Sequence, residues 1–447
     1  MTRSQSDVSE FMKIAIPVGV EAAIQRVFMI VEQVMVAYIG IGCVALAGVV
    51  NNLLYMTLVV LLPLGAGFSI LIAQFRGQGN FDGVKTLAIA SIVATTGISS
   101  LLSLLGWFFN VQLLRLFGVN DIPGATEFLG ILLVGGPMMI VGSVISNILR
   151  VEGQAKLPMT VTTSSLAIAN CLTVLAVYSD ATDQQRMFAV GLAILAGYSV
   201  RLGLLVYLLW RHMGFSVAEL SGSAALTSYM KRGFAIALPM SASKLVWICG
   251  LASFTAVFAQ EGVELLAVSQ IVIAVQSAFI MLASGVPVAS NSLVGNAVGA
   301  GIATLASDRA RKVIVISAAF SIILVIIMVA SLPILPSIYG GLSEIQVSQL
   351  NACGIIAALS IPIIVLNMAI GSGIVASGGD TRFLFYIDAV ATLLVGLPVA
   401  LLLWHLTDLG ISAVFIGRAV EETVRLTLTT LRYKTGRWNL SSVSVAS

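Results

Sequence analysis

The sequence predicts an all-α membrane protein with twelve transmembrane helices, arranged as two six-helix lobes related by a parallel internal repeat. Of its 447 residues, 58% are hydrophobic and only 10% are charged, whereas a soluble globular domain carries about 25% charged residues. The mean hydropathy of +1.04 agrees with this composition. Apolar runs of the length that crosses a bilayer recur twelve times, and several features return at one fixed spacing.

Short polar stretches separate the apolar runs, and each run is expected to form one membrane-spanning helix. The predicted spans are residues 11–38, 44–74, 86–109, 127–149, 157–178, 188–210, 233–259, 265–295, 312–338, 348–375, 384–404 and 409–431. One longer polar stretch, from Arg211 to Gly233, separates the first six from the last six. The predicted lobes are therefore residues 1–220 and 221–447.

The two sets of spans repeat one another at a constant interval, the one that separates Pro17 from Pro239. Three further residue pairs keep the same interval: Gly77 and Gly299, Gly79 and Gly301, and Gly118 and Gly340. Because each unit contains an even number of spans, both units have the same orientation in the membrane. Such parallel repeats are typical of alternating-access transporters.

The distribution of basic residues predicts the orientation. Of the 23 lysines and arginines, 16 fall at the N-terminus, in the loops after even-numbered spans and in the C-terminal tail, whereas the opposite loops hold only Arg115 and Arg186. Because basic loops stay in the cytoplasm, both termini are expected there. We expect a multi-pass protein of the cell's inner (plasma) membrane, with the lipid bilayer as its surroundings.

Enzyme chemistry and metal binding are not expected. The four cysteines are widely spaced in apolar sequence, and the two histidines lie too far apart to share a metal ion. No Ser-His-Asp set and no phosphate-binding loop with its lysine is present. We therefore predict no catalytic residues, no cofactor, no metal and no nucleic-acid partner.

The first span carries charges that need a partner or a water-filled cavity, since a charge at the centre of a span costs roughly 2.5 to 3.5 kcal/mol. Helical periodicity of about 100° per residue places four side chains on one stripe. These are Glu21, Gln25, Phe28 and Glu32. Arg26 lies on a neighbouring stripe, and a direct pair between Arg26 and Glu32 is unfavourable because they point about 120° apart.

Several motifs resemble those of the multidrug and toxic compound extrusion (MATE) family between about Lys13 and Trp438. They include "IPVGVEAAIQRVFMIVEQVMVAYIG", "GAGFSILIAQFRGQGN" and "LRVEGQAKLPM" in the first half, and "GVPVASNSLVGNAVGAG", "SGGDTRF" and "GLPVALLL" in the second. The resemblance implies a two-lobed exporter whose central cavity alternates between the two faces of the membrane, driven by proton or sodium entry.

The resemblance also implies a coupling site in the first lobe. Glu32 stands where the family's first helix carries an acid implicated in cation coupling, and Asn170 matches the asparagine beside that acid. Val174 replaces a second acid, and Phe28 replaces a tyrosine. One acid with few neutral oxygens favours a proton over sodium, which needs several hard oxygen ligands.

The second half departs from the pattern, because Trp247 and Val365 stand where some members carry acids. Instead, the seventh span carries Lys244 and the eleventh carries Asp388. Arg26 and Lys244 occupy the first helices of the two lobes, which the resemblance implies line the cavity. They either hold an anionic substrate, or pair with Glu21, Glu32 or Asp388. Gln270 lines the cavity or bridges helices.

The arginines of the sixth and twelfth spans are expected to snorkel toward the cytoplasm and form ion pairs. These are Arg201, Arg418 and Arg425, the last two beside Glu421 and Glu422. The expected function is cation-coupled export of a small organic solute by a monomer. The alternatives are an exporter of an anionic metabolite, such as a siderophore or organic acid, and a flippase for lipid-linked precursors.

Overall fold

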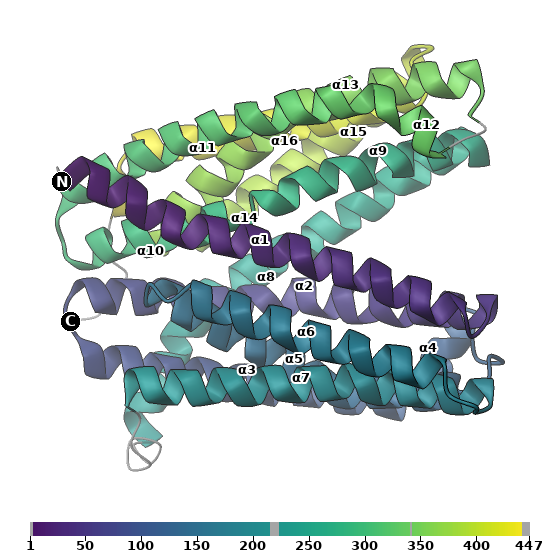
Figure 1. Ribbon diagram of the computed structural model, residues 1–447. Coiled ribbons are helices and arrows are strands. Elements are labelled where there is room, and N and C mark those ends of the chain that lie inside the picture. The colour runs from purple at the N-terminus through teal and green to yellow at the C-terminus, as the bar shows by residue number, and fades with distance from the viewer. Residues whose placement is uncertain (1–2, 215–222, 340–341, 440–447) are drawn as a thin grey trace. The chain divides into compact units, whose positions relative to one another are not determined.

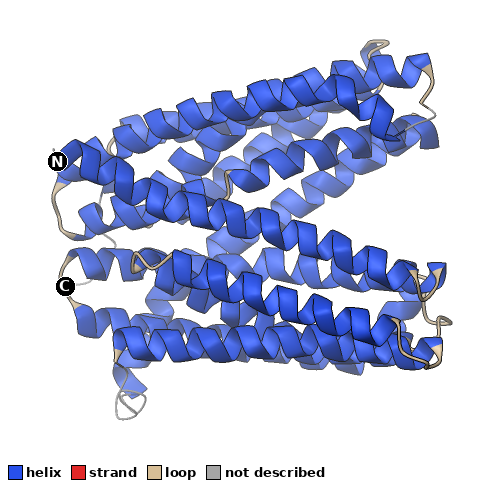
Figure 2. Cartoon of the chain, in the orientation of Figure 1, coloured by secondary structure: helices blue, strands red, loops and turns tan. Residues whose placement is uncertain are grey.

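The structure is a computed structural model that describes residues 3–214, 223–339 and 342–439. Those ranges contain helices and connecting loops and no strand (Figure 2). The predicted all-α fold is therefore confirmed, and each of the twelve predicted spans is helical. Eleven helices are long and apolar enough to cross a membrane within the described ranges. The twelfth, α16, is 24 residues long but carries four charges along its middle.

The first six predicted spans correspond to seven helices. They are α1 (Arg3–Ala37), α2 (Ile41–Gly77), α3 (Phe81–Phe108), the short α4 (Asn110–Leu116), α5 (Ala125–Val151), α6 (Lys156–Val177) and α7 (Asp183–Met213). The helix α4 was not predicted. It follows a single-residue interruption at Phe109 and lies against α3 and α5.

The second six spans are less continuous. They are α8 (Ser223–Gln260), α9 (Val263–Leu282) with α10 (Gly285–Gly299), α11 (Ala303–Ser331) with η2 (Leu332–Ile334) and α12 (Leu335–Tyr339), α13 (Glu344–Asn367) with η3 (Met368–Val375), α14 (Thr381–Ala389) with η4 (Val390–Gly396) and α15 (Leu397–Leu406), and α16 (Ile411–Lys434). A 3-10 turn, η5 (Arg437–Asn439), ends the described chain. The segments η3 and η4 are π-helical.

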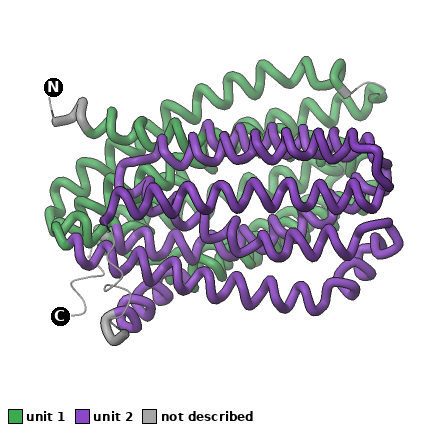
Figure 3. Tube along the Cα trace, turned by 60° about the horizontal axis from the view of Figure 1, so that its bottom comes forward, with its two compact units in different colours: residues 1–19, 73–80, 238–447 green, residues 20–72, 81–237 purple. Residues whose placement is uncertain are grey.

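Contacts divide the chain into two compact units (Figure 3). Unit 1 comprises residues 1–19, 73–80 and 238–447, and unit 2 comprises residues 20–72 and 81–237. The helices α1, α2 and α8 each contribute to both units. The lobes predicted at 1–220 and 221–447 follow chain order rather than contacts and stay a prediction, because their boundary lies in 215–222, outside the described residues.

Within unit 2, α5 packs against α3 and α7, and α7 packs against α6 (Figure 1). Its apolar core includes Leu46, Leu114, Phe128 and Val190, all fully buried. Within unit 1, α13 packs against α9, α11 and α16, and α15 packs against α16. These bundles position the polar side chains that the sequence singles out.

The repeat pair Gly77 and Gly299 meets inside unit 1. A Cβ atom on Gly77 would lie 2.0 Å from the Asn296 carbonyl oxygen, and one on Gly299 would lie 1.9 Å from that of Gln74. Gln74 and Asn296 are themselves separated by the repeat interval. The contact between α2 and α10 is therefore reciprocal, as expected of equivalent positions. Gly340 lies outside the described residues.

Candidate functional site

The predicted stripe on α1 divides into buried and accessible positions in unit 2. Glu21 is 1% exposed, whereas Gln25, Phe28 and Glu32 are half-buried and Arg26 is exposed. The greater exposure of Arg26 follows from the helical periodicity, because Arg26 lies on the stripe next to the one that contains Glu21. Arg26 makes no ion pair with any residue that the structure describes.

Glu32 lies beside neutral polar groups. Its neighbours are Asn51 of α2 and Tyr198 of α7, and no basic residue in the described ranges lies within ion-pair distance of its carboxylate. The Nδ2 atom of Asn51 is buried and has no hydrogen-bond partner among the described residues. The site therefore holds a carboxylate inside a span without a counter-charge.

Asn170 is 5% exposed and belongs to the same unit. Its Nδ2 donates to the Leu166 carbonyl oxygen at 3.0 Å, and its Oδ1 is buried without a hydrogen-bond partner. No hydrogen bond joins Asn170 to Glu32. Asn51, which the sequence reading did not select, lies next to the carboxylate instead.

Glu21 anchors a second polar cluster in unit 2. Its Oε2 lies 2.7 Å from Nη2 of Arg150 in α5, and Nη1 of Arg150 donates to Asn147 Oδ1 at 2.8 Å. Arg201 of α7 is 8% exposed and interacts electrostatically with both Glu21 and Arg150. Glu21 is thus buried among arginines rather than open to a cavity.

The predicted residues of the second half have different environments within unit 1. Lys244 and Gln270 are exposed, whereas Trp247 and Asp388 are half-buried. Lys244 has an attractive electrostatic interaction with Asp388, but no ion pair joins them. Asp388 pairs instead with Arg425, whose Nε lies 2.9 Å from Oδ1 of Asp388.

Arg425 of α16 holds three carboxylates together. Besides Asp388, its Nη2 lies 2.6 Å from Oε1 of Glu421, and its Nη1 pairs with Glu422. Thr392 donates its hydroxyl to Glu421 Oε1 at 2.6 Å and accepts from Arg425 Nη2 at 3.1 Å. The planar guanidinium allows these contacts in several directions at once.

Two π-helical segments border this network. Asn367, which precedes η3, donates to Glu422 Oε2 at 2.7 Å, and Thr392 lies within η4. A Cβ on Gly396 of η4 would lie 2.7 Å from Glu421 Cβ, so glycine is needed for this approach. Isolated π-helical turns are frequent at functional sites. Here Thr392 of η4 and Asn367, directly before η3, both contact the charges of α16.

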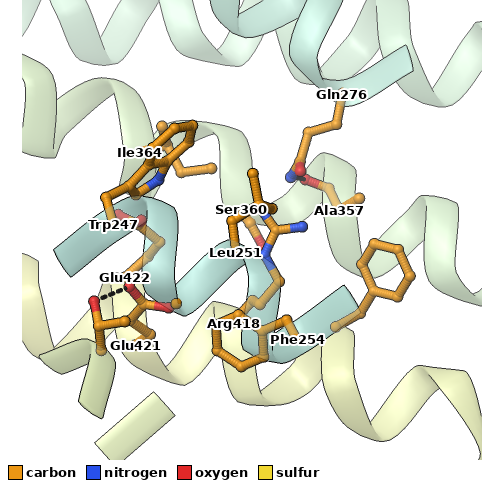
Figure 4. A pocket seen from close by; sticks show the side chains of 13 residues that line it. Trp247, Leu251, Phe254, Gln276, Ala357, Ser360, Ile364, Arg418, Glu421 and Glu422 are labelled. Atoms are coloured by element: carbon orange, nitrogen blue, oxygen red, sulfur yellow. Dashed lines mark hydrogen bonds between the residues drawn. The ribbon is translucent and has the colours of Figure 1, made fainter. Parts of the chain in front are cut away.

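A cavity with about 30 Å³ of space for water-sized molecules adjoins the network (Figure 4). Its polar lining comes from α9, α13, η4 and α16, and its apolar lining mainly from α8. The polar side chains are Gln276, Ser360, Thr392, Arg418, Glu421 and Glu422. Of the residues predicted to line a cavity, Trp247 is among its walls.

The sequence did not single out Asn51 or Tyr198, whereas the ion pairing expected of Arg425 is confirmed by its contacts with Glu421 and Glu422. Arg418, Glu421, Glu422 and Arg425 recur every three to four residues on α16, which places them on one face. That spacing was a signal of a shared buried network rather than of snorkelling. Asn51 carried a weaker signal, as half of an "NN" pair inside an apolar run. Among the described residues, no group of three metal-ligating side chains occurs.

Comparison with known proteins identifies the family. The MatE family model matches residues 17–175 and 239–402, so its two matches begin at Pro17 and Pro239, the first pair of the internal repeat. A Thermotoga maritima protein named "Probable multidrug resistance protein NorM" is 24% identical over 97% of this chain and 94% of its own length.

Solved structures of the family share the fold. The Vibrio cholerae MATE transporter VcmN, in a point-mutant form, superposes with a TM-score of 0.85 at 17% identity, covering 97% of this chain and 98% of that one. The eukaryotic MATE transporter AtDTX14 gives 0.80 at 20% identity, covering 98% and 97%. A transporter from Pyrococcus furiosus described as having a binding pocket of reverse polarity gives 0.82 at 19% identity, covering 95% of each chain.

The members of this family are transporters rather than enzymes, and the family model spans most of both halves of the sequence. The helical content and the twelve spans agree with that assignment. The chain therefore belongs to the MatE family of multi-pass membrane transporters.

Proposed function

We propose that this transporter is an antiporter that exports a small organic solute by alternating access in exchange for a proton. The observation that carries the proposal is Glu32, a half-buried carboxylate within a span whose described neighbours, Asn51 and Tyr198, are neutral. A carboxylate without a counter-charge binds a proton readily when water leaves its surroundings. Its occupancy can therefore differ between two conformations of the protein.

A proton rather than sodium is the proposed coupling ion because oxygen ligands around Glu32 are few. A hard cation takes several oxygen ligands. The carboxylate of Glu32 has the side chains of Asn51 and Tyr198 beside it, and Asn170 has one unpartnered oxygen of its own. A single proton needs only the carboxylate.

We place the protein in the inner (plasma) membrane with both termini in the cytoplasm. The support is the excess of basic residues on one set of loops, with 16 of 23 lysines and arginines there and in the termini. In that orientation the antiporter uses the inward proton gradient to drive solute out of the cell.

Efflux from energised vesicles tests the role of Glu32. Glu32→Gln keeps the size and a polar group but cannot exchange a proton, so solute-triggered proton release should fall to background, whereas Glu32→Asp should retain part of it. The matched control is Glu344→Gln at the exposed start of α13. Unchanged coupled efflux in Glu32→Gln, with protein present in the membrane, would contradict the assignment.

A second candidate is export of an anionic metabolite. Arg26 and Lys244 are exposed and form no ion pair with any described residue, so each could face an anionic solute in water. The relative from Pyrococcus furiosus supports the idea that pocket polarity varies in this fold. The same vesicles separate the candidates, because anionic solutes should trigger proton release only if the second is right.

A further inference from the structure

Arg418 is a charged side chain without a partner inside unit 1. It lies on α16 in the interior of the span, and it makes no hydrogen bond or ion pair with any residue in the described ranges. Its Nη1 atom is buried and unsatisfied. An unpaired charge away from bulk water is unfavourable. The guanidinium of Arg418 therefore needs either a counter-charge or water molecules to solvate it.

The neighbouring carboxylates are engaged elsewhere. Glu421 and Glu422 lie one helical turn from Arg418, but both pair with Arg425. Glu421 also accepts a hydrogen bond from Thr392, and Glu422 accepts one from the side chain of an asparagine in α13. The carboxylate oxygens of Glu421 and Glu422 therefore already accept hydrogen bonds from other groups. They make the electrostatic potential at Arg418 more negative without contacting its guanidinium.

The guanidinium extends into the cavity, toward Gln276 and Ser360 and away from the two carboxylates (Figure 4). Gln276 donates one N–H to the Ala357 carbonyl oxygen at 2.8 Å, which leaves its second amide N–H for a ligand. The cavity offers about 30 Å³, more than the roughly 10 to 15 Å³ that one water molecule needs. Apolar side chains, including Phe254 and Phe415, form the remaining walls.

We propose that this cavity binds a small monovalent anion, either a halide or the carboxylate group of a small organic acid. Arg418 supplies the charge and several N–H donors, and Gln276 supplies a further N–H. The site lies entirely within unit 1. It is distinct from Glu32 and independent of which cation drives transport, so its test is a binding measurement rather than transport.

The charges facing the site limit its affinity. Within the described residues, three cations balance three carboxylates: Arg418, Arg425 and Lys244 against Asp388, Glu421 and Glu422. Glu421 and Glu422 line the same cavity and repel an anion. Removing one of those charges should therefore tighten binding, whereas removing Arg418 should weaken it.

Thermal unfolding of the purified full-length protein in detergent tests this pair of opposite effects. Gluconate is exchanged for chloride, bromide or acetate at constant ionic strength and fixed pH. The unfolding midpoint should rise saturably with the small anions. Arg418→Gln should weaken the apparent affinity about tenfold or more, and Glu422→Gln should tighten it. Arg382→Gln, an exposed arginine outside the network, is the control.

The tighter of chloride and acetate identifies the natural class of anion. A midpoint that does not respond to any of these anions, or responds equally in Arg418→Gln, would overturn the proposal and leave water as the partner of Arg418. If that variant does not fold, bromide-soaked crystals of the unmodified protein decide the question. An anomalous peak in contact with Arg418 supports the site, and density without anomalous signal there refutes it.

Discussion

Glu21 is a single carboxylate placed near two guanidiniums inside a membrane span. It pairs with Arg150 at 2.7 Å, while Arg201 is close enough to interact with both. Buried ion pairs gain little over apolar packing, but breaking one leaves an uncompensated charge. The two arginines therefore depend on Glu21 more than Glu21 depends on either arginine.

This asymmetry predicts unequal losses of stability. Glu21→Leu leaves the buried Arg201 and the half-buried Arg150 without a counter-charge and should lower the free energy of unfolding by about 3 to 5 kcal/mol. Arg150→Leu should cost less, because Arg201 remains near Glu21. Equilibrium unfolding in mixed micelles measures both, with the exposed Lys156→Leu as a control. Equal losses in the two variants would show that Arg201 does not share the carboxylate.

At the scale of elements, the twelve spans could be predicted because about 20 consecutive apolar residues are required to cross a bilayer. The interruptions could not. The break between α9 and α10 and the π-helical turns η3 and η4 fall inside continuous apolar runs. They depend on the hydrogen-bond register and on packing against α16, which hydropathy does not record.

The close contact between α2 and α10 predicts that a larger side chain at Gly77 destabilises the protein. Gly77→Val would place side-chain atoms against the Asn296 carbonyl, where a Cβ alone already lies 2.0 Å away. We expect a loss of about 1 to 3 kcal/mol in unfolding free energy, typical of overpacking. Gly48→Val, in the same helix with no atom within 4 Å of its Cβ position, is the matched control. Equal unfolding midpoints for the two variants would show that the helices separate at little cost.

For the whole molecule, the repeat was visible in the sequence, but the chemistry of its two halves was not. At the repeat interval, Gln25 corresponds to Trp247 and Glu32 to Phe254. Unit 2 keeps an acid with neutral neighbours, whereas unit 1 has a network around Arg425. The charges of any single span could not reveal that network, because its members come from α13, α14, η4 and α16.

Orientation is the property of the whole chain that the basic residues predict. Since 16 of the 23 lysines and arginines fall on one side, single cysteines placed at opposite ends of the spans should differ in labelling by a membrane-impermeant maleimide. Asp183→Cys and Glu344→Cys should react in intact cells, whereas Asp82→Cys and Asp308→Cys should react only after permeabilisation. The background reaction of Cys171 and Cys249, which are exposed in the structure, is measured on the unmodified chain. Labelling of the opposite set in intact cells would show that the protein has the opposite orientation. The inward proton gradient would then move solute in the opposite direction.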